Sequence, residues 1–307
     1  METLDLEQSV SFKNLLLATD FSSISKSALA YAAAIASRYR SKIYVVHVIP
    51  PEPRMPIPME VSFPELDRDR RQAELAMQAF VSGDQLKAIR HETLLPRGPI
   101  WLELSELIES HEIDLLVVGT RGRAGLRKVI LGSVAEELFR QASCPVLTIG
   151  PAVPAGMGTE LRRILLATDF GEASQQALPY AFALAADSNA ALTLLHVLMP
   201  SPFRNIGPYW YMGRDVVEAH ETAQRNTLGR LKQLIPPERK LGSDPELLVG
   251  FGLVSHEIVR IAAASQADLI VMGVNRAASV RVSAHLPWAT AYEVVGHAKC
   301  PVLTVRA

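Results

Sequence analysis

The sequence predicts an α/β protein with two tandem doubly wound parallel-sheet domains, and two observations support that prediction. The first is an internal repeat: residues 15–21 (LLLATDF) return 149 residues later as 164–170 (ILLATDF), and residues 144–149 (CPVLTI) return as 300–305 (CPVLTV). The second is the alternation, in each half, of short β-rich runs with longer helical segments. Parallel strands need such helical crossovers, which cover both faces of the sheet.

The repeat also predicts the domain boundaries. A chain of 307 residues that repeats once forms two domains of ordinary size, each able to bury its own core. Residues 150–158 are rich in proline and glycine, which is typical of a linker. We therefore expect one domain over residues 1–150 and a second over residues 151–307.

The first half contains five strand-like segments that are compact, apolar or β-branched. In chain order they are residues 14–18, 42–48, 92–95, 114–118 and 146–149. Between them, alanine and leucine at helical spacing, or charged residues mixed with apolar ones at that spacing, predict helices. These helices are residues 22–39, 65–82, 100–111 and 133–142, and the proline-rich residues 50–58 form a loop.

The second half repeats this order. The expected strands are residues 163–167, 191–197, 246–249, 268–272 and 302–305. The expected helices are residues 175–186, 216–234, 254–264 and 290–297.

Composition and charge exclude several classes of partner and location. A formal net charge of −1 gives no electrostatic reason to expect binding to nucleic acid or to an anionic membrane. The longest apolar runs, residues 28–36 and 181–186, are too short to span a bilayer. The acidic first residues lack the basic region of a secretory signal. We expect a cytoplasmic protein with no nucleic-acid or membrane partner.

The two cysteines, Cys144 and Cys300, occupy equivalent positions of the repeat, each before Pro-Val-Leu at the start of a strand. A thiol at such a position is typically buried and structural, and a reactive thiol is the alternative. Two cysteines so far apart indicate neither a disulfide framework nor a zinc site.

Three features of the first half follow strand ends, where ligands bind in doubly wound sheets. Asp20 follows the first strand, His47 and Val48 end the second, and Gly119-Thr120-Arg121-Gly122 follows the fourth. Glycine lets backbone N–H groups approach a phosphate closely.

The segment after these glycines adds two further signs of an anion site. Gly132-Ser133 precedes a helix, and Ser133 with Glu136 has the spacing of a capping box. The start of a helix carries partial positive charge, which suits a phosphate. Turn geometry alone could explain one pair of glycines. The longer pattern, together with the basic residues between the glycines, favours phosphate binding; these residues are Arg121, Arg123, Arg127 and Lys128.

These motifs resemble those of the universal stress proteins, in the form that carries two such domains in tandem. The ATP-binding branch of that family has glycine, two residues, glycine, nine residues, glycine, and then serine or threonine. Gly119, Gly122, Gly132 and Ser133 match each fixed position. The resemblance covers nearly the whole chain and implies a Rossmann-like fold of the adenine nucleotide α-hydrolase type.

The resemblance also implies which residues bind the nucleotide. Ala18, Thr19 and Asp20 resemble the segment that lies along the adenosine, and the backbone of Val48 resembles the group that meets the adenine. The residues that resemble the phosphate and ribose cradle are Gly119, Gly122, Gly132, Ser133 and Val134, with Arg121 and Arg123 in the same loop. ATP, ADP or AMP is the expected ligand. The sequence leaves open whether Mg²⁺ accompanies the phosphates.

The second half departs from the pattern. Asp169, Val197 and Gly273 keep part of an adenosine slot. Arg276 replaces the second glycine, and Trp288 falls opposite Gly132. We expect this half to have lost ATP binding, and to act as a scaffold or to hold a different ligand.

The sequence therefore predicts a stress-response protein that binds an adenine nucleotide through its first domain, with the nucleotide acting as a signal. The alternatives are a slow ATPase and an interaction protein without nucleotide function. His47 and His196 have no catalytic partner that the sequence identifies, so we expect the backbone to satisfy them and assign no catalytic residue. Residues 146–149 and 302–305 resemble the edge strands of family dimers. That resemblance implies an intramolecular pseudo-dimer, with a homodimer and an unknown protein partner as further expectations.

Overall fold

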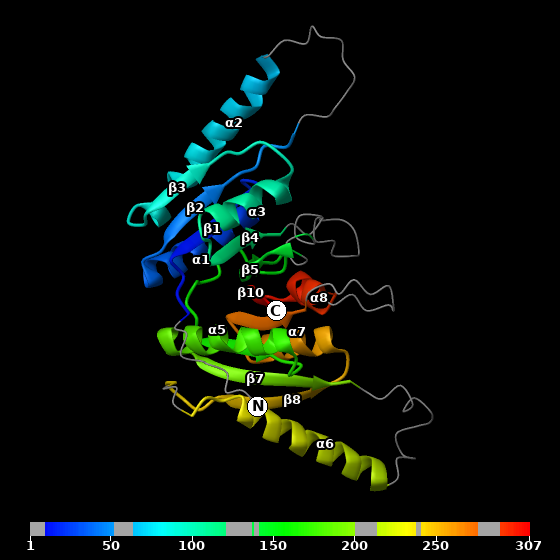
Figure 1. Ribbon diagram of the computed structural model, residues 1–307. Coiled ribbons are helices and arrows are strands. Elements are labelled where there is room, and N and C mark those ends of the chain that lie inside the picture. Colours follow the sequence, from blue (N-terminus) through cyan, green and yellow to red (C-terminus); the bar gives the residue numbers. More distant parts are fainter. Residues whose placement is uncertain are drawn as a thin grey trace, which may run out of the picture. The chain divides into compact units, whose positions relative to one another are not determined.

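The structure is a computed structural model that describes residues 10–51, 64–120, 137, 141–199, 214–237, 241–275 and 289–307. The chain divides into two compact units, Ser11–Thr159 and Glu160–Ala307 (Figure 1). None of the described helices is long and apolar enough to cross a membrane.

The first unit is a parallel sheet in the order β3-β2-β1-β4-β5. Its strands are β1 (Asn14–Ala18), β2 (Lys42–Val46), β3 (His91–Leu94), β4 (Leu115–Gly119) and β5 (Val146–Ile149). The order of the strands reverses between β1 and β4. In a sheet of this kind the reversal opens a crevice beyond the carboxyl ends of these two strands.

The helices of the first unit are α1 (Ser23–Tyr39), α2 (Pro64–Val81) and α3 (Ile100–Ser110), with a short 3₁₀ helix, η1 (Asp84–Leu86). The sequence did not predict η1. Of the helix expected over residues 133–142, most lies outside the described residues, and Glu137 and Gln141 are helical.

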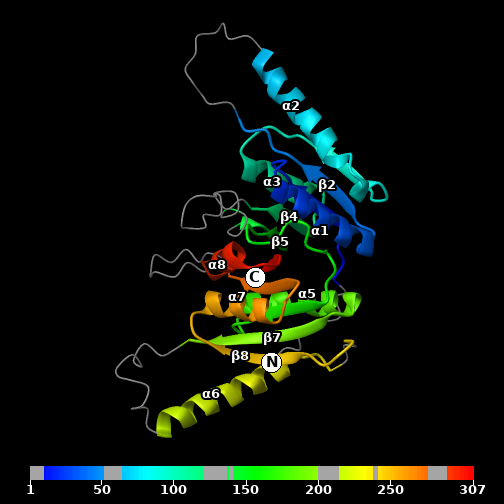
Figure 2. The same ribbon diagram turned by 180° about the vertical axis from the view of Figure 1, so that it is seen from behind.

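Both faces of the first sheet are covered, as the apolar strands predict (Figures 1 and 2). Leu15, Leu16 and Leu17 are each 0% exposed, although successive side chains of a strand point to opposite faces. On one face α3 contributes Leu104 and Ile108 to the core around Leu16. Helix α1 packs against β1 and β4 on the other face.

The second unit repeats this arrangement, in the order β8-β7-β6-β9-β10. Its strands are β6 (Arg163–Ala167), β7 (Ala191–Leu198), β8 (Glu246–Phe251), β9 (Leu269–Val274) and β10 (Val302–Arg306). Its helices are α5 (Glu172–Ser188), α6 (Arg214–Gln233), α7 (Val254–Ala264) and α8 (Ala289–His297).

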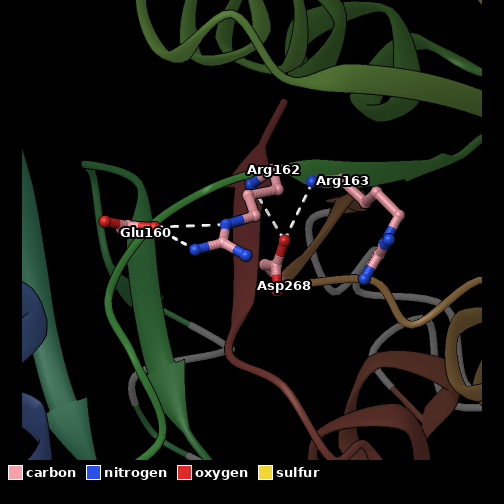
Figure 3. A network of polar contacts seen from close by, with 4 residues as sticks. All are labelled: Glu160, Arg162, Arg163 and Asp268. Atoms are coloured by element: carbon pink, nitrogen blue, oxygen red, sulfur yellow. Dashed lines mark hydrogen bonds and ion pairs between the residues drawn. The ribbon is translucent and has the colours of Figure 1, made fainter.

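In each unit, an aspartate next to the start of one central strand accepts hydrogen bonds from the backbone at the start of the other. Asp268 Oδ2 accepts hydrogen bonds from the backbone N–H groups of Arg162 and Arg163, both at 2.9 Å, beside the ion pair of Arg162 with Glu160 (Figure 3). In the first unit, Asp114 Oδ2 accepts in the same way from the backbone N–H groups of Lys13 and Asn14 at the start of β1. The sequence predicted these aspartates as the first residues of strands, whereas β4 and β9 begin one residue later.

Cys144 and Cys300 are both free and buried, which confirms the expectation for these residues. Burial raises the pKa of each thiol from its ordinary value of 9.0 to about 12. Burial therefore disfavours the thiolate, which is the nucleophilic form, at both positions.

We predict that a thiol reagent such as DTNB labels the folded chain at pH 8 at least about 1,000-fold more slowly than it labels the chain in urea. The thiolate is the form that reacts, and the raised pKa of the buried thiols leaves little of it. In urea both cysteines should react. Rapid labelling of either cysteine without denaturant would show that its thiol is exposed.

Candidate functional site

The residues expected to hold the adenosine meet at the crevice between β1 and β4. Ala18 ends β1, and its register partners are Val118 on β4 and Val46 on β2. Gly119 ends β4 and so lies at the same edge of the sheet, next to Thr19.

The remaining residues of the predicted site lie outside the described part of the chain. They are Arg121, Gly122, Arg123, Gly132, Ser133 and Val134. The same holds for Arg276 and Trp288 of the second half. The assignment of these residues to a phosphate cradle therefore stays a prediction.

A sharp turn ends β1 and places Asp20 at the crevice. Phe21 has a left-handed backbone with φ of 62°, which is uncommon for a residue with a bulky side chain. Two hydrogen bonds hold this conformation: the N–H of Phe21 donates to Thr19 Oγ1 (2.9 Å), and the N–H of Ser22 donates to Asp20 Oδ1 (3.0 Å). Unusual backbone conformations of this kind are concentrated at functional sites.

His47 holds the same turn from the neighbouring strand. Its Nδ1 lies 2.8 Å from the carbonyl oxygen of Thr19. A carbonyl can only accept, so Nδ1 carries the hydrogen and the ring donates to the backbone. The ring also packs at a tilt of 33° against Phe21, with centroids 4.3 Å apart, and Phe80 of α2 meets Phe21 edge-on at 5.7 Å. This geometry confirms the prediction that the backbone satisfies His47.

The turn leaves the peptide groups of Val48 facing the crevice. The N–H of Thr19 donates to the carbonyl of Val46 (2.8 Å), as in a parallel ladder. One step further, the ladder would pair Val48 with the carbonyl of Thr19 and the N–H of Phe21. His47 donates to that carbonyl and the hydroxyl of Thr19 accepts from that N–H. The N–H groups of His47 and Ile49 donate to the carbonyls of Leu94 and Pro96 on the β3 side, so the peptide groups of Val48, which lies between them, point to the β1 side. The peptide groups of Val48 are therefore directed to the space beyond the end of β1.

The second unit contains an equivalent turn. His196 Nδ1 lies 2.8 Å from the carbonyl of Thr168, and the N–H of Phe170 donates to Thr168 Oγ1 (3.0 Å). Phe170 has φ of 64°, and Arg230 of α6 lies over its ring at 3.8 Å. The second unit thus keeps the turn that ends the first strand of the first unit.

Gly119 and Gly273 make room for the helix that follows the turn. A Cβ at Gly119 would lie 2.8–3.0 Å from the side chain and backbone of Ile24 in α1. A Cβ at Gly273 would lie 2.2–2.4 Å from the backbone of Ala173 and Ser174 in α5. Close helix–strand packing therefore explains why both units have glycine here. Gly273 by itself is no evidence for a nucleotide in the second unit.

Other positions of the edge differ between the units. Ser22 caps α1 with its side chain, whereas Gly171 at the start of α5 has no side chain to do so. Phe251 and Leu253, at the end of β8, are exposed apolar residues.

Among the described residues, no cluster of three or more histidine, cysteine, aspartate or glutamate side chains could hold a metal ion.

Each half of the chain matches the sequence model of the Universal stress protein family, over residues 11–150 and 160–306. The chain belongs to the universal stress protein family. Universal stress protein MJ0531 of Methanocaldococcus jannaschii is 30% identical over 140 residues, which are 45% of this chain and 82% of that protein. A universal stress protein of Mycolicibacterium smegmatis is 28% identical over 209 residues, 66% of this chain and 70% of that protein.

Solved structures agree on the fold. The crystal structure of a universal stress protein from Archaeoglobus fulgidus matches 97% of this chain and 99% of its own, with a TM-score of 0.66 at 20% identity. The functionally unknown protein PA1789 of Pseudomonas aeruginosa matches 97% of this chain and 94% of its own, with a TM-score of 0.59 at 17% identity. The chain thus consists of two tandem universal stress protein domains with the Rossmann-like α/β fold.

We predict that Gly119→Ala and Gly273→Ala each lower the free energy of unfolding, by about 1–3 kcal/mol as in other overpacked sites. Gly273→Ala should cost more, because its Cβ would meet backbone atoms alone. Urea denaturation of the full chain measures both.

Gly229→Ala is the matched control. Gly229 lies inside α6 with no atom within 4 Å of an added Cβ, so alanine should stabilise the helix by roughly 0.5–1 kcal/mol. If Gly119→Ala and Gly273→Ala were as well tolerated as this control, the packing explanation for the two glycines would be wrong.

Proposed function

We propose that the first unit binds an adenine nucleotide, ATP or its ADP and AMP relatives, and that occupancy acts as a signal in a stress response. One observation supports this most strongly: the turn after β1, fixed by hydrogen bonds from Phe21, Ser22 and His47, brings Asp20 to the sheet edge at which β4 ends at Gly119. The same half of the sequence carries Gly122, Gly132 and Ser133.

The groups at this edge suit the parts of adenosine. One peptide N–H and one carbonyl on the same residue, Val48, match a ring nitrogen acceptor and the amino group of adenine. The carboxylate of Asp20 accepts hydrogen bonds, so it suits the ribose hydroxyls or the same amino group. Gly122, Gly132 and Ser133 would hold the phosphates through backbone N–H groups and a helix start. Mg²⁺, which keeps most of its water and binds to phosphates, needs no protein cage of its own.

We propose a binding role and assign no catalytic one. His47, the one histidine beside the crevice among the described residues, donates to the backbone and packs at a tilt against Phe21, so it serves to hold the turn. We propose that the second unit, with Trp288 and Arg276 in place of two glycines, does not bind the nucleotide.

We predict that Asp20→Ala removes most of the stabilisation that ATP gives the full chain, whereas Asp169→Ala leaves it intact. ATP at a hundred times its dissociation constant should add about 2.7 kcal/mol to the wild type. Thermal unfolding with and without ATP measures the difference.

Asp169→Ala is a close control, because Asp169 makes the same hydrogen bonds in the second unit as Asp20 makes in the first. Both variants should therefore lose similar stability without ATP. An equal loss of the ATP effect in both variants would contradict the assignment of the site to the first unit.

A further inference from the structure

The buried hydroxyl of Ser25 contacts the carboxylate of Asp20, a residue of the proposed site. Ser25 lies in the first turn of α1 and is 1% exposed. Its Oγ donates to Asp20 Oδ1 at 2.7 Å, and the N–H of Asp20 donates to the same Oγ at 3.3 Å. The backbone N–H of Ser25 donates to Ser22 Oγ at 3.2 Å. Ser25 therefore links the start of α1 to both the main chain and the side chain of Asp20.

These contacts determine the orientation of an exposed side chain. Asp20 lies on the surface, where an aspartate ordinarily samples several staggered rotamers. Here Oδ1 accepts from two donors on different residues, the hydroxyl of Ser25 and the N–H of Ser22. Hydrogen bonds to an ionised carboxylate are roughly twice as strong as neutral ones. Two such bonds to one oxygen hold the carboxylate in a single orientation before any ligand arrives.

We infer that Ser25 is a positioning residue of the nucleotide site, which acts through Asp20 and does not contact the ligand. This inference rests on the proposed function and extends it to a residue inside the helix. A ligand that binds to an already oriented carboxylate loses less conformational freedom on binding, so its affinity is higher. The burial of Ser25 excludes a direct contact with a nucleotide at the surface.

The second unit provides a matched control for this role. Ser174 Oγ donates to Asp169 Oδ1 at 2.5 Å, and the N–H of Asp169 donates to Ser174 Oγ at 3.2 Å. Ser174 is 4% exposed. A purely structural effect of removing the hydroxyl should therefore be similar in both units, whereas an effect on ATP binding should be confined to Ser25.

The experiment measures the dissociation constant of ATP, with Mg²⁺, by calorimetry on the full chain and on four variants: Ser25→Ala, Ser174→Ala, Asp20→Ala and the double variant Ser25→Ala/Asp20→Ala. Ser25→Ala should weaken ATP by about two- to tenfold, the cost of ordering one side chain on binding. Ser174→Ala should leave the affinity unchanged while lowering the melting temperature as much as Ser25→Ala does. The double variant should bind no more weakly than Asp20→Ala, because Ser25 acts only through Asp20.

Three results would overturn the inference alone: wild-type affinity in Ser25→Ala, an equal loss of affinity in Ser174→Ala, or additive losses in the double variant. A wild-type chain that binds no ATP would instead overturn the proposed function, and the role of Ser25 with it.

Discussion

The turn that ends β1 is the constraint on which the site depends. A parallel strand that continued past Ala18 would pair its peptide groups with those at the end of β2. Instead, the hydroxyl oxygen of Thr19 accepts a hydrogen bond from the N–H of Phe21, and the ring of His47 donates one to the carbonyl of Thr19. The backbone of Val48 is left facing the crevice.

The repeat separates what the fold requires from what the proposed ligand requires. Both units keep the turn, its histidine and a glycine at the end of the next strand. In both, that glycine admits the first turn of a helix, so it belongs to the packing of the domain. The positions expected to contact phosphate are among those that differ in sequence, with Trp288 opposite Gly132. A ligand site can thus be lost while the fold persists, because the two depend on different residues.

The strand pattern of this protein could be predicted well from its sequence. β1, β5, β6 and α7 have the predicted bounds, since each is a compact apolar or helical run with clear ends. β2 ends at Val46, two residues earlier than predicted, because its pairing with β3 stops at Leu94; in the second unit, where β8 continues to Phe251, β7 runs on to Leu198 beside the same turn. The sequence pattern shows which side chains are apolar, but it does not show where a neighbouring strand stops offering hydrogen-bonding partners.

The site was only partly predictable. Asp20 and Val48 could be assigned because strand ends meet at one edge of a parallel sheet. The left-handed Phe21 could not, since a side-chain hydrogen bond and packing against His47 stabilise it, and these appear only once the chain is folded. The contact of Ser25 with Asp20 spans five residues across a turn, and helical spacing alone indicates nothing of it.

The central claim is that one of two similar units binds the nucleotide. Mass spectrometry of the small molecules released when freshly purified chain is denatured tests this most directly. We expect an adenine nucleotide at about one per chain, lost in Gly132→Trp, which copies the second unit into the first. Two nucleotides per chain, or one that persists in Gly132→Trp, would contradict the claim.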